Sequence, residues 1–211
     1  LVFEGLDTYA EVWLNDQALI QTDNFFKTWR VDCKAHLKVG TNHLKIIFRS
    51  PLKTKAAAYH NLGYQLPAGN DADSIKISPF VRTAPYHFGW DWGPRVVTMG
   101  IWRPVRLEAH SRLRVTDVYF DQRDISRTKA VVQTVITVEH LSKETLPITL
   151  AVYHKDQLLD QQTALLDGDH IYTLDFTLKN PQLWWCNGLG KPHLYPFRVE
   201  IHVDNQLCFD K

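Results

Sequence analysis

The stretch HFGWDWGPR, residues 87–95, places one aspartate, Asp91, between two tryptophans, Trp90 and Trp92. A buried carboxylate without a partner is costly, and it either pairs or takes up a proton. Aromatic faces beside a hydrogen-bonding carboxylate suit a ligand that is apolar on one face and carries hydroxyls at its rim, as a sugar does. A simpler interpretation is a chain corner, in which the tryptophans pack inward and Asp91 caps a turn. The residues alone leave both interpretations open.

The other reactive side chains form no comparable pattern. The ten histidines are dispersed without a metal-ligand pair at helical spacing, and His87, beside the motif, is expected to be structural. Cys33, Cys186 and Cys208 lie far apart without a Cys-x-x-Cys pair, which indicates neither a zinc site nor a disulfide framework. Their isolation slightly favours a reducing, cytoplasmic compartment. We therefore expect no metal and no organic cofactor.

Composition and charge narrow the class of partner. The 211 residues carry 24 Lys and Arg against 23 Asp and Glu, a net charge of +1, and 45% of them are hydrophobic. A nucleic-acid-binding domain needs a strongly basic face, and the loosely basic stretch from Arg95 to Arg114 does not supply one. No apolar run approaches the roughly eighteen residues of a membrane span. We expect a globular protein that binds neither nucleic acid nor membrane.

Period-two alternation of apolar residues dominates the chain and predicts short strands with one buried face. It is clearest over residues 44–50, 101–107, 172–178 and 197–203. Turn sequences lie between the expected strands, at 14–16, 38–42 and 166–170. In the last strand Phe197, Val199, Ile201 and Val203 should face inward. No stretch has the apolar spacing of a long helix. The pattern is typical of all-β sandwiches.

Residues 51–86 depart from this pattern, since they show little alternation and many chain breakers. A loop of this length inside a compact domain is uncommon and usually functional or disordered. It leads directly into the Trp-Asp-Trp motif. A boundary near EAHSRLRV, residues 108–115, predicts two domains, 1–111 and 112–211.

Three longer stretches resemble a known family. LVFEGLDTYAEVWLN, APYHFGWDWGPRVVTMGIWRPVRLEA and NPQLWWCNGLGKPHLYPFRVEI are similar to the non-catalytic N-terminal part of glycoside hydrolase family 2. The first two resemble its jelly-roll, galactose-binding-like domain, and the third resembles the immunoglobulin-like sandwich that follows. GWDWGPR favours the β-mannosidase branch, whereas NPQLWW is common to the wider family. Cys186 stands where many relatives have proline.

The resemblance gives the motif residues their expected roles in binding substrate. In the β-mannosidase branch this loop reaches over the mouth of the catalytic barrel, so Trp90 and Asp91 are expected to contact the sugar. Trp92 is expected to be a core residue that supports the loop, with Gly93-Pro94 fixing the turn. Arg95 is expected to orient Asp91 by a charge-assisted bond. Trp184 and Trp185 are expected to pack at a domain interface.

The resemblance also implies what lies outside this sequence. The family's TIM barrel carries two catalytic glutamates, about 5 Å apart in retaining enzymes. The six glutamates here are expected on solvated strand faces and none is expected to be catalytic: Glu4, Glu11, Glu108, Glu139, Glu144 and Glu200. We therefore expect an inactive fragment of a retaining exo-β-mannosidase, truncated in the first strands of domain one and at the end of domain two. Its partners would be a β-mannoside and the C-terminal TIM barrel of the same chain. The alternatives are a free-standing carbohydrate-binding module and a structural β-sandwich.

Overall fold

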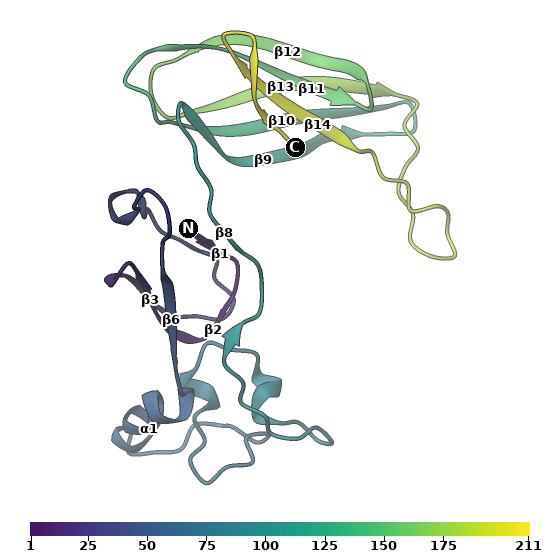
Figure 1. Cartoon of the computed structure of the whole chain (residues 1–211). Helices are drawn as coiled ribbons and strands as arrows, with labels where there is room; N and C mark the ends of the chain where they lie inside the picture. Colours follow the sequence, from purple (N-terminus) through teal and green to yellow (C-terminus); the bar gives the residue numbers. More distant parts are fainter. The chain divides into compact units, whose positions relative to one another are not determined.

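The computed structural model describes residues 1–211, which divide into two compact units, Leu1–Glu108 and Ala109–Lys211. Both are built mainly of antiparallel β-strands (Figure 1). The sheets agree with the all-β fold that the sequence predicts. No helix in either unit is long and apolar enough to cross a bilayer.

The first unit contains three small sheets, with strand orders β5-β1-β8, β4-β3-β6 and β2-β7. Its strands are β1 (Val2–Phe3), β2 (Leu6–Asp7), β3 (Tyr9–Leu14), β4 (Gln17–Asp23), β5 (Trp29–Arg30), β6 (Leu44–Arg49), β7 (Gly100–Ile101) and β8 (Val105–Arg106). Phe3, Leu6, Ala10 and Val12 form the buried core between them. The predicted turn at 14–16 is a tight hairpin between β3 and β4, because Asn15 and Asp16 both adopt positive φ angles, which suit a two-residue hairpin turn.

Two predictions for this unit were wrong. Residues 51–86 are not wholly irregular, since they begin with an eleven-residue helix, α1 (Pro51–Asn61). Proline is favourable in the first turn of a helix, and the Lys- and Ala-rich sequence after it has high helix propensity without a strong apolar stripe, which is why periodicity missed it. The predicted strand over 101–107 is broken into β7 and β8, and the side chains of Ile101 and Leu107 are exposed.

After α1 the chain is mostly irregular up to β7. This segment contains two short 3₁₀ helices, η2 (Ser78–Phe80) and η3 (Pro85–Phe88). A third, η1 (Lys34–His36), lies earlier in the chain, before β6. Figure 1 shows α1 and the irregular segments gathered at the end of the first unit where β6 ends. A small apolar cluster of Tyr9, Ile77, Val81 and Phe88 packs this region against β3. Burial, and secondarily the charge of Asp23, raise the pKa of Tyr9 to about 12.

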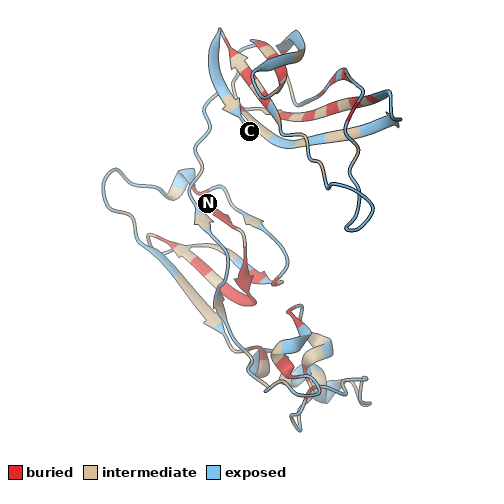
Figure 2. Cartoon of the chain, turned by 90° about the vertical axis from the view of Figure 1, so that its right-hand side faces the viewer, coloured by how far each residue is buried: buried red, intermediate tan, exposed pale blue.

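The second unit is a two-layer sandwich. One sheet has the order β13-β10-β9 and the other β12-β11-β14-β15. The strands are β9 (Leu113–Ile125), β10 (Lys129–His140), β11 (Leu146–His154), β12 (Gln157–Leu166), β13 (His170–Lys179), β14 (Phe197–Val203) and β15 (Gln206–Asp210). Figure 2 shows buried residues alternating with more exposed ones along these strands, as a shared core requires.

The predicted register of β14 is confirmed. Val199, Ile201 and Val203 are fully buried, and Phe197 packs against the same core cluster while remaining partly exposed. The neighbouring sheet contributes Ile136 and Leu174 to that cluster. Because a one-residue slip would turn every one of these side chains to solvent, burial of the apolar face fixes the pairing.

Replacing Ile201 by alanine should lower the free energy of unfolding by about 2–5 kcal/mol, because it leaves a cavity in a fully buried site. Ile171, which is 60% exposed on β13, provides the matched control, and Ile171→Ala should cost less than about 1 kcal/mol. Urea unfolding of the 211-residue chain, followed by circular dichroism, measures both. Equal losses for the two variants would contradict the assigned register.

Candidate functional site

The Trp-Asp-Trp motif forms a tight turn at the surface of the first unit. The amide of Gly93 donates to the carbonyl of Trp90 at 3.1 Å, which places Asp91 and Trp92 at the two central positions of the turn. The amide of Val96 donates to the carbonyl of His87 at 3.0 Å and closes the wider loop. The motif is therefore a defined hairpin-like loop projecting from the irregular region.

Two glycines are required by the close packing of this loop. A Cβ on Gly93 would lie 2.3 Å from the Trp90 ring, so the indole rests directly on the backbone of the turn. Gly89 has a φ of +102°, which favours glycine, and an added Cβ there would lie 3.1 Å from the carbonyl oxygen of Asn70. Gly93 thus lets the Trp90 ring lie against the turn, and Gly89 allows the backbone of the loop to pass close to Asn70.

The side chains at the turn are presented to solvent. Trp90 is 42% exposed, and the Asp91 carboxylate is exposed and accepts no hydrogen bond from the chain. Trp92 is 84% exposed, so the prediction that it is a core residue supporting the loop was wrong. Its central position in a two-residue turn directs it away from the protein, and the ring of Trp90 occupies the inner face instead.

The predicted pairing of Arg95 with Asp91 was also wrong. Arg95 Nε donates to Oδ1 of Asp71 at 3.1 Å, and its Nη2 lies 3.3 Å from Oδ2 of Asp73. The guanidinium also lies over the ring of Phe88. The Asp71 side chain is fully buried, so it needs a cation far more than the exposed Asp91 does.

Asp71 and Asp73 hold the irregular segment next to the motif. The second carboxylate oxygen of Asp71 accepts from the amide of Ser78 at 3.1 Å. Hydrogen bonds from the amides of Ile75 and Ser74 lower the pKa of Asp73, and Arg95 adds to the effect. In the sequence, Asp71 and Asp73 are marked only by the acid-rich stretch GNDADS, residues 69–74. This stretch does not indicate that they pair with Arg95.

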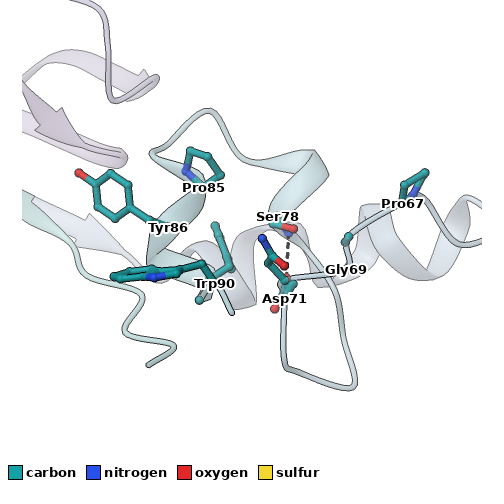
Figure 3. A pocket seen from close by; sticks show the side chains of 11 residues that line it. Pro67, Gly69, Asp71, Ser78, Pro85, Tyr86 and Trp90 are labelled. Carbon is teal, nitrogen blue, oxygen red and sulfur yellow. Dashed lines mark hydrogen bonds between the residues drawn. The ribbon is translucent and has the colours of Figure 1, made fainter. Parts of the chain in front are cut away.

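A hollow of about 490 Å³ opens beside Trp90. Its lining is mainly apolar, and Figure 3 shows Pro67, Gly69, Asp71, Ser78, Pro85, Tyr86 and Trp90 around it. Both oxygens of Asp71 are already bonded to Ser78 and Arg95, so this acid is a structural part of the wall. The hollow therefore offers aromatic and proline surfaces, with the free carboxylate of Asp91 on the adjoining turn.

Five of the six glutamates pair with arginines: Glu4, Glu11, Glu108, Glu139 and Glu200. The Glu200 side chain is only 12% exposed, so the predicted solvated face does not hold for it. Glu4 and Glu108 both contact Arg106, which brings two carboxylates near one another. Burial favours the protonated form of Glu108, but hydrogen bonds from Arg106 and Arg30 outweigh it and lower its pKa. A glycosidase acid needs the opposite shift, so this pair is a surface ion network.

Trp184 and Trp185 lie on the connection between β13 and β14 and are largely exposed. Their packing at a domain interface stays a prediction. No three His, Cys, Asp or Glu side chains in residues 1–211 gather in an arrangement that holds a metal ion.

Comparison with known families fits both units. The model described as "Glycosyl hydrolase 2 galactose-binding domain-like" matches residues 1–103, and the model described as "Glycosyl hydrolases family 2" matches residues 113–210. The chain belongs to glycoside hydrolase family 2. The family's catalytic barrel is absent from these 211 residues, since both units are β-structures of other kinds.

Individual relatives carry mannosidase names. The chain is 32% identical over 98% of its length to β-mannosidase B of Emericella nidulans, and 34% identical over 95% to that of Aspergillus fumigatus. The crystal structure of β-D-mannosidase from Dictyoglomus thermophilum matches all of this chain with a TM-score of 0.86 at 30% identity. The chain spans about a quarter of each relative, 24% of the fungal proteins and 26% of the bacterial one.

Gly93→Ala should displace the Trp90 indole, because the added methyl group would overlap the ring. The indole N–H resonance of Trp90 in a ¹H–¹⁵N spectrum of the chain is expected to shift clearly. Gly69 lines the same hollow with open space where its Cβ would be, so Gly69→Ala should leave that resonance in place. An unmoved resonance in Gly93→Ala would show that the turn does not hold the ring.

Proposed function

We propose that this chain is the non-catalytic N-terminal part of a retaining exo-β-mannosidase, which releases mannose from the non-reducing ends of β-mannosides. Residues 1–111 and 112–211 serve as its galactose-binding-like and immunoglobulin-like domains. A C-terminal TIM barrel of the same chain supplies the two catalytic glutamates. The mannosidase names of relatives that match nearly all of this chain support the proposal.

One observation carries the role of this chain at the sugar pocket. The turn presents an aromatic face, Trp90, beside a carboxylate, Asp91, that is exposed and unengaged within the chain. An acid that only stabilised its own turn would bond to that turn. A free carboxylate on a braced loop is instead available to accept hydroxyl hydrogen bonds from a ligand.

The physical contributions of the loop divide between its side chains. Burying the Trp90 face against a sugar ring contributes affinity without hydrogen bonds. Asp91 accepts hydrogen bonds from sugar hydroxyls and so fixes the position of the ring relative to the catalytic glutamates. Trp92 adds an exposed aromatic surface at the rim. Arg95 acts at a distance from the sugar, because its partners are Asp71 and Asp73.

In the mechanism of retaining glycosidases, Asp91 would affect the rate of the chemical step as well as substrate binding. Retaining hydrolysis passes through an oxocarbenium-like transition state, in which the sugar ring distorts and hydrogen bonds to its hydroxyls strengthen. An acceptor whose bond tightens in that state raises kcat. The cost of ordering the acceptor is small, since Gly93 and the turn already hold the backbone behind it.

In the full-length enzyme, Asp91→Ala should lower kcat/KM for an aryl β-mannoside roughly ten- to a hundred-fold, as loss of a hydrogen bond to a charged group does. Asp91→Asn should cost less if geometry matters more than charge. Asp156→Ala, on the turn between β11 and β12, is the matched surface control and should leave kcat/KM unchanged. Unchanged kinetics in Asp91→Ala would contradict the assigned sugar contact.

The 211-residue chain by itself should not hydrolyse the same aryl β-mannoside, because no glutamate pair in it is arranged for catalysis. Assay of the purified chain, with the full-length enzyme as positive control, measures this directly. Turnover by the chain that disappears on mutating one of its own glutamates would overturn the division of labour.

A further inference from the structure

The loop that carries Trp90 and Asp91 is tied at both ends to one buried carboxylate, that of Asp7 at the end of β2. Asp7 is 3% exposed. Its Oδ1 accepts from the hydroxyl of Thr83 and its Oδ2 from the hydroxyl of Thr98, each at 3.0 Å. Thr83 precedes the turn and Thr98 follows it, so a single side chain closes the base of the loop.

A histidine inside the loop joins the same cluster. Nδ1 of His87 lies 3.6 Å from Oδ2 of Asp7 and 3.3 Å from the hydroxyl oxygen of Thr83. The Thr83 hydroxyl has one proton, which it donates to Asp7, so the proton shared with His87 must be on Nδ1. The His87 carbonyl in turn accepts from the amide of Val96. His87 is thus the structural histidine that the sequence predicts, and it links Asp7 to both arms of the loop.

The cluster is matched to a carboxylate and not to an amide. Oδ1 of Asp7 accepts from Thr8 as well as from Thr83, whereas Oδ2 faces Thr98 and the protonated nitrogen of His87. Each of these neighbours can donate to a carboxylate, which only accepts. An asparagine would replace one acceptor oxygen by an N–H group, so at least one hydroxyl would have to turn and accept instead, which rearranges the ties that hold the loop.

We propose that Asp7 is a positioning residue of the sugar site, which sets the orientation of Trp90 and Asp91 through the loop 83–98. The inference rests on the proposed function, in which those two side chains contact the sugar. Asp7 is buried beneath the loop, so it acts through Thr83, His87 and Thr98 and not on substrate. A loop with little regular structure depends on such side-chain ties for its geometry.

The test is a double-mutant cycle in the full-length enzyme, with an aryl β-mannoside as substrate. Asp7→Asn should lower kcat/KM roughly ten-fold in the wild-type background, because small misplacements of contacting groups are costly. In the Asp91→Ala background the same change should cost clearly less, about two- to three-fold, since one of the two groups that it positions is gone and only Trp90 remains. A merely structural effect on the enzyme would be equal in both backgrounds.

A second variant keeps the inference testable if Asp7→Asn fails to fold. Thr98→Val removes one donor at nearly constant shape, and it should show the same coupling to Asp91→Ala with a smaller loss. Thr116→Val on β9, whose hydroxyl bonds to the carbonyl of Thr137, is the matched control and should show no coupling.

The outcomes separate the two proposals. If Asp91→Ala lowers kcat/KM but neither Asp7→Asn nor Thr98→Val couples to it, the positioning role of Asp7 is overturned and the sugar contact stands. If Asp91→Ala leaves kcat/KM unchanged, the sugar contact fails and the positioning role fails with it. Coupling of both variants to Asp91→Ala, and none for Thr116→Val, supports the inference.

Discussion

Two buried carboxylates, those of Asp7 and Asp71, hold together a part of the first unit that has little regular secondary structure. Between β6 and β7 the chain has only α1 and two short 3₁₀ helices, so few backbone ladders fix its path. Asp7 gathers hydroxyl donors from both ends of the motif loop, and Asp71 takes Arg95 and the amide of Ser78. Because a buried charge cannot remain unpaired, each acid selects one arrangement of the loops around it.

As a result, a defined turn stands on an otherwise irregular surface. Strands β1 to β8 form the sheets of this unit, and the bonds of the two carboxylates fix residues that lie outside any strand. Function in β-sandwich folds is commonly placed on such loops, while the sheets account for stability. At this turn Trp90 presents an exposed aromatic face and Asp91 an exposed carboxylate that accepts no hydrogen bond from the chain.

The sequence predicted those features of the structure that are determined by residues close together in the chain. Alternation identified β6, β13 and β14 and the inward face of β14, and the family motifs identified both kinds of domain. Helix α1 was missed because its apolar residues form no stripe. The predicted role of Trp92 was wrong because this residue occupies a central position of a tight turn and is exposed. The predicted role of Arg95 was wrong because it depends on a partner far along the chain: Asp71, twenty-four residues before Arg95, cannot be found from local spacing. For the same reason nothing in the sequence pointed to Asp7, ninety-one residues before its partner Thr98.

In the proposed function, the turn at Trp90 and Asp91 forms one wall of a mannose site. A crystal structure of the full-length enzyme with mannose bound would test this directly. We expect a carboxylate oxygen of Asp91 within about 2.5–3.2 Å of a sugar hydroxyl, with the Trp90 ring against the sugar. Mannose bound in the barrel with no contact to Asp91, and with that carboxylate folded back onto its own turn, would contradict it.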